Sequence, residues 1–260
     1  MRFTVKFRRK KHERRQNNKN QKLNETKDIQ RFFADVLPKF DKDALKKYLE
    51  DCYLYNKGNL DGFDLNEETT LFVKNLLNKK YVSFKARDIY IEDEIKILFF
   101  KKDFLDYKFD RQIKIRSYKN SKIDSGINTL DIPLPSLFLK LESRYRTDND
   151  ETNIILREVV ANLIIHRSYA STDGVAYIRE YTDRYEFENH ASKNIDNSNL
   201  EKLVNFTASS IPGNSIIADF FDKAGYCERF RKGQSTFSGL KNVVSISLKD
   251  KNVIAKIKLL

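Results

Sequence analysis

The chain contains few of the residues that punctuate or cross-link a fold. Its 260 residues include 8 Gly, 4 Pro and 2 Cys. Cys52 and Cys227 lie far apart without the spacing of metal ligands, which argues against a disulfide framework or a zinc site. Because Gly and Pro are scarce and hydrophobic residues make up 40%, we expect most of the chain to fold around a core.

Long hydrophobic runs and phosphate-binding glycine loops are also absent. No apolar run approaches the roughly 18 residues that a membrane-spanning helix needs. The N-terminus is charged from its start and lacks the apolar centre of a signal peptide, so we expect a cytoplasmic protein without membrane contact. Since no Gly-x-x-x-x-Gly-Lys-[Ser/Thr] motif occurs, the sequence does not encode a P-loop motor.

The positive charge is concentrated at the N-terminus. Ten of the 49 Lys and Arg residues, but one of the 37 Asp and Glu residues, lie within residues 2–22, so this segment carries +9 of the net +12. We predict that residues 1–27 form a flexible basic arm. It either contacts nucleic-acid phosphates or serves as a solubilising tail. The candidate contact residues are Arg8, Arg9, Lys10, Lys11, Arg14 and Arg15.

Residues 28–104 read as helices followed by strands. Leu45, Tyr48, Leu49 and Cys52 recur at intervals of three and four, which predicts the core-facing stripe of a helix that starts near Asp41. A second helix is predicted over 67–78, with Leu71, Leu76 and Leu77 in the core. Alternating and continuous apolar residues over 81–116, including the run Ile95–Phe100, predict two to four strands.

Residues 105–260 are predicted to form one domain that mixes helices and strands. Pro133 and Pro135 lead into a helix, and a second helix covers 154–169. Strands are expected over 174–181 and 185–189, a helix near 199–204, and a hairpin that pairs 243–248 with 253–259.

The helix over 154–169 carries one narrow polar stripe on an otherwise apolar surface. Glu158, Asn162 and His166 are spaced by four residues and therefore share one face. Buried polar groups need partners, which either the protein or a ligand must supply. The stripe is thus either an internal hydrogen-bond set or a binding site.

The motif order resembles the C-terminal putative ATP-binding domain of RecG-like proteins, which is related to the histidine-kinase-type (GHKL) ATPases. Four motifs over about 154–234 carry the resemblance. They are Glu158-x-x-x-Asn162-x-x-x-His166 with Arg167-Ser168-Tyr169, then Asp183-Arg184 with Tyr185–Asn189, then Asn214–Ala218, and Ala224–Glu228. The resemblance implies an α+β fold, with a two-layer α/β sandwich and a mixed sheet over 105–260.

The resemblance also implies a site for Mg²⁺ and ATP. Asn162 would hold the metal, and Glu158 would act as the base that orients or deprotonates water. His166 and Arg167 would either approach phosphate or cap the helix. The implied nucleotide-binding residues are Asn162, His166, Asn189, Gly213, Asn214, Lys232 and Gly233.

Three positions depart from the family pattern. A glycine expected after the second strand is replaced in Asn189-His190-Ala191, Ser168 stands where the family has Asp, and Lys232 replaces one lid glycine. The sequence therefore predicts a Mg-ATP-binding, weakly hydrolysing regulator, a possible ATPase, that contacts nucleic acid through the arm. The alternative is a non-enzymatic DNA- or RNA-binding regulator, or a protein scaffold, with a degenerate ATPase-like domain.

Overall fold

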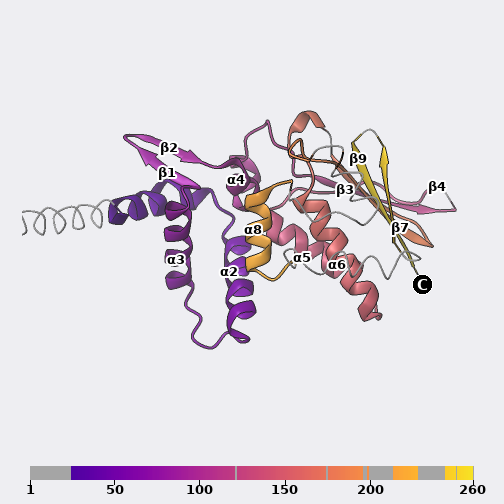
Figure 1. Ribbon diagram of the computed structural model, residues 1–260, viewed down its shortest axis with the longest axis horizontal. Coiled ribbons are helices and arrows are strands. Elements are labelled where there is room, and N and C mark those ends of the chain that lie inside the picture. Colours follow the sequence, from indigo (N-terminus) through magenta and orange to yellow (C-terminus); the bar gives the residue numbers. More distant parts are fainter. Residues whose placement is uncertain are drawn as a thin grey trace, which may run out of the picture. The chain divides into compact units, whose positions relative to one another are not determined.

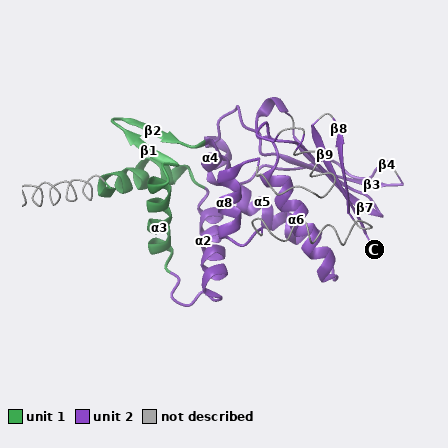
Figure 2. Ribbon diagram, in the orientation of Figure 1, with its two compact units in different colours: residues 1–40, 64–92 green, residues 41–63, 93–260 purple. Residues whose placement is uncertain are grey.

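A computed structural model describes residues 25–120, 122–173, 175–195, 198, 213–227, 244–249 and 251–259 (Figure 1). The chain divides into two compact units (Figure 2). Unit 1 comprises residues 1–40 and 64–92, and unit 2 comprises 41–63 and 93–260. This division differs from the boundaries expected after residues 27 and 104, because the helical segments 42–57 and 93–99 both belong to unit 2.

Unit 1 is a small helical unit with one hairpin. Its elements are η1 (Phe32–Val36), η2 (Leu37–Lys39), α3 (Leu65–Asn78), β1 (Val82–Lys85) and β2 (Asp88–Ile91). The two strands pair antiparallel. Phe40 packs edge-on against both Phe32 and Phe72, so three aromatic rings form the centre of this unit.

Unit 2 contains the helices and strands of the main sheet. Its helical elements are α2 (Lys42–Lys57), α4 (Asp93–Phe99), η3 (Lys102–Phe104), α5 (Leu134–Tyr145), α6 (Asp150–Ile165), η4 (Ser171–Asp173) and α8 (Ser215–Lys223). Its strands are β3 (Ile113–Lys119), β4 (Lys122–Ile123), β5 (Asn128–Leu130), β6 (Ala176–Glu180), β7 (Arg184–His190), β8 (Val244–Lys249) and β9 (Asn252–Lys258).

The sheet of unit 2 is mixed, in the order β4-β3-β6-β7-β9-β8, with β5 also paired to β3. β3 and β6 run parallel, while the neighbours β6–β7, β7–β9 and β8–β9 are antiparallel. Ile178 and Phe187 face each other across β6 and β7 and are fully buried. Tyr145 of α5 packs edge-on against Phe187, and α6 contacts β7, so helices cover this face (Figure 1). The predicted α+β class with a mixed sheet is confirmed.

Several predicted elements are confirmed with their local causes. Asp41 caps α2 by accepting a hydrogen bond from the Ala44 N–H at 3.0 Å. The predicted helices after Pro133 and around Glu158 are α5 and α6, and the predicted hairpin is β8–β9. The helix predicted over 154–169 ends at Ile165, so His166 to Tyr169 lie beyond it. The helix expected near 199–204 lies outside the described residues. Among the described residues, no helix has both the length and the apolar character to cross a bilayer.

Two sequence predictions were wrong. The run Ile95–Phe100, predicted as a strand, forms the short helix α4, with acidic residues in its first turn. A continuous apolar run has no period that separates a strand from a helix buried on all sides. Leu71, predicted in the core, is 45% exposed, because α3 buries the stripe of Thr69, Phe72, Val73 and Leu76.

The assignment of the two sheet faces is testable with neighbouring residues of β6. Ile178 is 0% exposed and Tyr177 is 36% exposed. Ile178→Ala should lower the free energy of unfolding by about 2–5 kcal/mol, because it leaves a cavity in the core. Tyr177→Ala should cost about 1 kcal/mol, mainly through strand preference. Urea denaturation of both variants checks this, and equal losses would contradict the assignment.

Candidate functional site

Helix α6 begins with a side-chain cap and is stabilised by packing. Asn149 accepts a hydrogen bond from the Thr152 N–H at 2.9 Å. The β-branched residues of α6 lower its intrinsic helix propensity, but most of them are buried. The helix contacts α5, α8 and β7, and these contacts hold it in place.

Glu158 and Asn162 form a pair on the half-exposed stripe of α6. The Asn162 Nδ2 donates to Glu158 Oε1 over 3.0 Å, and both residues are half-buried. A carboxylate can only accept hydrogen bonds, so the amide must turn its NH₂ group toward Glu158. The Asn162 Oδ1 is left as an acceptor, and it receives no hydrogen bond in the described part of the chain. Glu158 has further interaction partners of its own.

His166 ends α6 and is held inside the protein. Its backbone N–H donates to the Asn162 carbonyl, and its Nδ1 accepts from the Gly213 N–H at 3.4 Å. Burial lowers the pKa of His166 to about 4. The ring is therefore neutral near pH 7 and does not supply a positive charge for phosphate.

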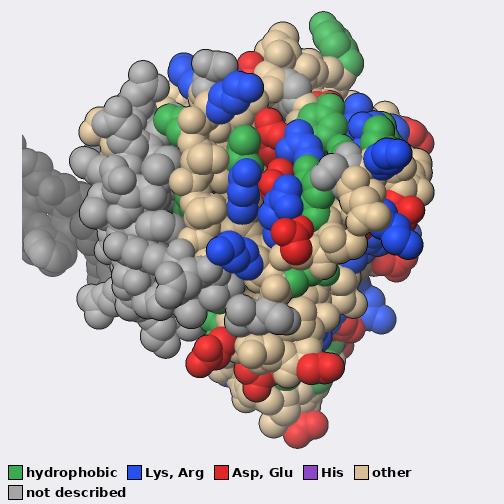
Figure 3. Space-filling view, turned by 90° about the vertical axis from the view of Figure 1, so that its right-hand side faces the viewer, with side chains coloured by type: hydrophobic (Ala, Val, Ile, Leu, Met, Phe, Trp, Pro, Cys, Tyr) green, Lys and Arg blue, Asp and Glu red, His purple; other side chains and the backbone are tan. Residues whose placement is uncertain are grey.

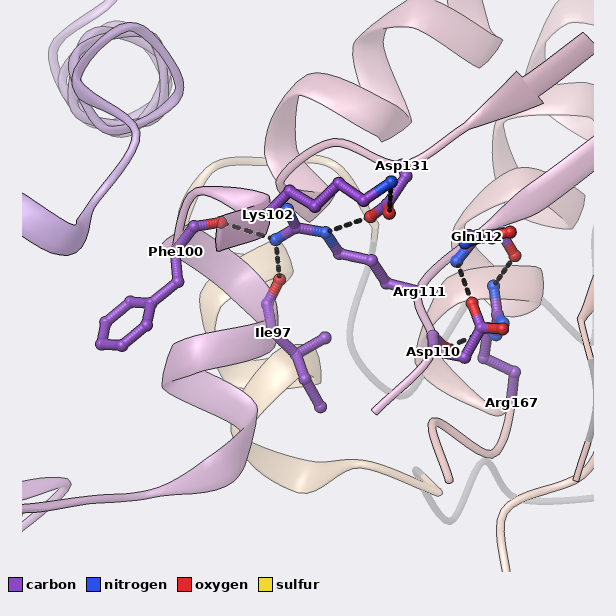
Figure 4. A network of polar contacts seen from close by, with 8 residues as sticks. All are labelled: Ile97, Phe100, Lys102, Asp110, Arg111, Gln112, Asp131 and Arg167. Atoms are coloured by element: carbon purple, nitrogen blue, oxygen red, sulfur yellow. Dashed lines mark hydrogen bonds and ion pairs between the residues drawn. The ribbon is translucent and has the colours of Figure 1, made fainter. Parts of the chain in front are cut away.

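Arg167 is buried and bonds to backbone carbonyls (Figure 4). Its guanidinium donates to the carbonyls of Gln112 at 3.1 Å, Asp110 at 3.2 Å and Ser168 at 3.3 Å. It also lies 4.9 Å from the centre of the Tyr169 ring. Burial is the main cause of the lowered pKa of Arg167. Its acceptors lie outside α6, so Arg167 does not cap the helix and instead braces the residues after α6 against residues 110–112.

Gly213 and Asn214 join the end of α6 to the start of α8. The Asn214 Nδ2 donates to the carbonyls of Ile165 and Arg167, each over 2.8 Å. Those carbonyls belong to the last turn of α6 and the residues after it, where no intrahelical donor remains. A Cβ at Gly213 would lie 2.8 Å from the Ser192 Cβ, so close packing explains this glycine without a ligand.

Asn189 lies near the end of β7 and is 6% exposed. Its Nδ2 makes a long hydrogen bond of 3.3 Å to the neighbouring carbonyl of His190. Ala191, two residues after Asn189, forms an isolated antiparallel β-bridge with Arg167 and donates its N–H to the Lys251 carbonyl. Ala191 stands where the RecG-like pattern has glycine, and its backbone already contacts two other segments of the protein.

The structure separates the predicted site residues into two groups, with Asn189 in neither of them. Glu158 and Asn162 form the half-exposed pair, which we call the α6 stripe. His166, Gly213 and Asn214 are bonded to one another or to backbone at the end of α6, which we call the α6 junction. Lys232, Gly233 and the predicted arm contacts Arg8, Arg9, Lys10, Lys11, Arg14 and Arg15 lie outside the described residues.

Sequence reasoning missed a second buried arginine, Arg111. Its Nε donates to Asp131 at 3.1 Å and its Nη1 to the Phe100 carbonyl at 2.7 Å, while its Nη2 has no hydrogen-bond partner among the described residues (Figure 4). No sequence signal marks it, because an isolated Arg between Asp110 and Gln112 reads as a surface residue. Arg111 ties the segment before β3 to Phe100 and Asp131, and Arg167 binds the carbonyls of Asp110 and Gln112 in the same segment, so together they fix the start of this strand.

Within the residues that the structure describes, no group of three or more His, Cys, Asp and Glu side chains is placed to hold a metal ion. Any Mg²⁺ held at the α6 stripe would therefore take most of its oxygen ligands from a nucleotide and from water.

Comparison with models of known protein families finds no match, and comparison with curated proteins finds none either.

The buried imidazole at the α6 junction predicts a pH dependence of stability. The folded pKa of about 4 lies below the ordinary 6.5, so the unfolded chain binds the proton more readily between these values. The free energy of unfolding should be highest above pH 6.5 and fall by up to about 3 kcal/mol as the pH drops toward 4.

Urea unfolding between pH 4 and 7.5 measures this effect, with His166→Asn as the comparison. Asparagine keeps an acceptor for the Gly213 N–H but does not titrate in this range. The wild-type curve minus the variant curve should show the loss between pH 6.5 and 4. Parallel curves would mean that His166 is not buried in its neutral form.

Proposed function

We propose that this protein binds a Mg²⁺-nucleoside triphosphate at the α6 stripe and acts as a nucleotide-responsive regulator. The orientation of Asn162 carries the proposal. Because Glu158 accepts from the Asn162 NH₂ group, the amide oxygen is turned away as a fixed, half-buried acceptor. A neutral hard oxygen in this setting suits Mg²⁺ that is already bound to phosphates.

The proposal is consistent with the single protein oxygen that the α6 stripe offers to a metal ion. With one amide oxygen from the protein, the metal should bind together with nucleotide and only weakly alone. Mg²⁺ would supply charge neutralisation for the phosphates when bound. Asn162 would fix its position, and Glu158 would hold the amide in register.

Binding is better supported than rapid turnover. Glu158 is the candidate base, but one of its oxygens already accepts from Asn162. His166 is neutral near pH 7, and Arg167 is committed to three backbone carbonyls, so neither offers the phosphates a free cation. We therefore propose weak or no hydrolysis and a regulatory role for the bound nucleotide.

Thermal unfolding with and without Mg-ATP tests the site. A ligand at about 100 times its Kd adds about 2.7 kcal/mol, which raises the Tm of a chain this size by about 5 °C or more. Asn162→Ala should abolish most of this rise. Glu158→Gln should retain it, because the Gln carbonyl can still accept from the Asn162 amide, while any hydrolysis should be lost.

Ile154→Ala is the matched control, since Ile154 is 57% exposed and lies one turn before Glu158 on the same helix. It should leave the rise in Tm unchanged. Mg²⁺ without nucleotide should give little shift. The absence of any wild-type shift at millimolar Mg-ATP would refute the proposal.

We also propose that the N-terminal arm contacts nucleic acid, on the basis of its net charge of +9. Each phosphate neutralised releases counterions, so affinity should fall steeply with salt. Deleting residues 1–22 should weaken binding to duplex DNA at 50 mM salt by at least about tenfold and flatten the salt dependence. Fluorescence anisotropy measures both, and unchanged affinity after truncation would assign the arm a solubilising role.

A further inference from the structure

The sheet of unit 2 has a second face that helices α5 and α6 do not cover. Alternate residues of each strand point to it, while Ile113, Ile178 and Phe187 point to the core. We call it the open face. On β3, β6, β7 and β9 its aromatic and charged members are Lys114, Arg116, Tyr118, Tyr177, Arg179, Arg184, Glu186, Glu188, Lys256 and Lys258, with Tyr181 directly after β6.

Tyrosine rings on the open face are arranged with arginines. Tyr118 and Tyr181 stack with ring centres 4.9 Å apart and an interplanar angle of 17°. The Arg184 guanidinium lies 3.9 Å from the centre of the Tyr181 ring, and Arg179 lies 5.7 Å from that of Tyr177. Tyr177 itself is 36% exposed, so part of its ring is accessible. The Tyr181 ring already contacts Tyr118 and Arg184, so the accessible ring of Tyr177 is the surface on which a further planar group can stack.

The open face has an excess of positive charge. Its strands place six Lys and Arg residues there against two acidic residues. Glu188 pairs with Arg179, and Glu186 pairs with Arg184 and Lys256, so both acids are neutralised locally. Within the described part of the chain, Lys114, Arg116 and Lys258 have no ion-pair partner.

Figure 3 views the molecule from the side on which Figure 1 places the strands. Lys and Arg side chains alternate there with hydrophobic and acidic ones. We propose that the open face binds single-stranded nucleic acid, with a base stacking on Tyr177 and phosphates contacting Lys114, Arg116 and Lys258. Single strands expose the faces of their bases, whereas a duplex keeps them stacked. An acidic peptide would use the cations but leave the tyrosine rings without a role.

Anisotropy of a labelled 12-nucleotide oligo(dT) and of a matched duplex, with the full chain, tests the open face. Removing one stacking ring, Tyr177→Ala, should weaken oligo(dT) binding by about tenfold and leave duplex binding nearly unchanged. Tyr107→Ala is the matched control, since Tyr107 is 94% exposed and lies outside the sheet. It should change neither affinity.

A charge variant tests the same face without touching an aromatic ring. Lys114→Ala with Arg116→Ala should make the slope of log Kobs against log salt shallower by about 1.4, since each phosphate contact to a single strand contributes about 0.7. Lys140→Ala, a single exposed charge on α5, is the control and should leave the slope unchanged.

The wild type and all variants contain the N-terminal arm, so its contribution to nucleic-acid affinity cancels when they are compared. The nucleotide site is not involved, and failure of one proposal leaves the other standing. Unchanged oligo(dT) binding in both open-face variants would overturn the inference, as would equal losses in Tyr107→Ala and Tyr177→Ala. Binding of a labelled poly-Glu peptide is the third measurement. If the charge variant loses affinity for this peptide but not for oligo(dT), the inference is overturned in favour of an acidic partner.

Discussion

The α6 junction is the constraint on which unit 2 depends. The last turn of any α-helix leaves carbonyl groups without intrahelical donors. Here the side-chain amide of Asn214 donates to the carbonyls of Ile165 and Arg167 at the end of α6. The backbone N–H of Asn214 also donates to the Ile165 carbonyl. Since Asn214 also begins α8, one side chain joins two helices. Arg167 extends the same junction to the loop before β3.

The sequence predicted the elements of this architecture better than the roles of its polar residues. The spacing of Glu158 and Asn162 correctly placed both on one face of α6, because helical periodicity depends on local geometry alone, whereas His166 follows the last residue of the helix. It did not reveal that His166 accepts from Gly213, since that contact joins residues 47 positions apart. The hydrogen bonds of Arg167, and those of Arg111 other than the one to Asp131, were equally unreadable, because their acceptors are backbone carbonyls, which every residue possesses.

The residues of the predicted motif therefore divide into two sets with different physical explanations. The His166–Tyr169 end of the motif is explained by internal bonding: Ser168 donates to Asp173 and Tyr169 to the Ile164 carbonyl. Gly213 is explained by its close packing against Ser192. Folding alone accounts for these residues, so their presence is not an argument for a nucleotide. Within the described part of the chain, the Asn162 Oδ1 is an atom of the motif that accepts no hydrogen bond from the protein.

The sheet separates the two proposed binding regions. β7 turns Phe187 toward the helices and Glu186 and Glu188 toward the open face, because side chains alternate along a strand. The helices pack against the apolar face of the sheet and form the core with it. The other face therefore carries residues that are compatible with water. Exposure to water does not explain why tyrosines stack with arginines beside unpaired lysines on this face. A face with equal numbers of positive and negative side chains would be as soluble. The surplus of cations next to accessible rings is the feature that a polyanion with planar bases would complement.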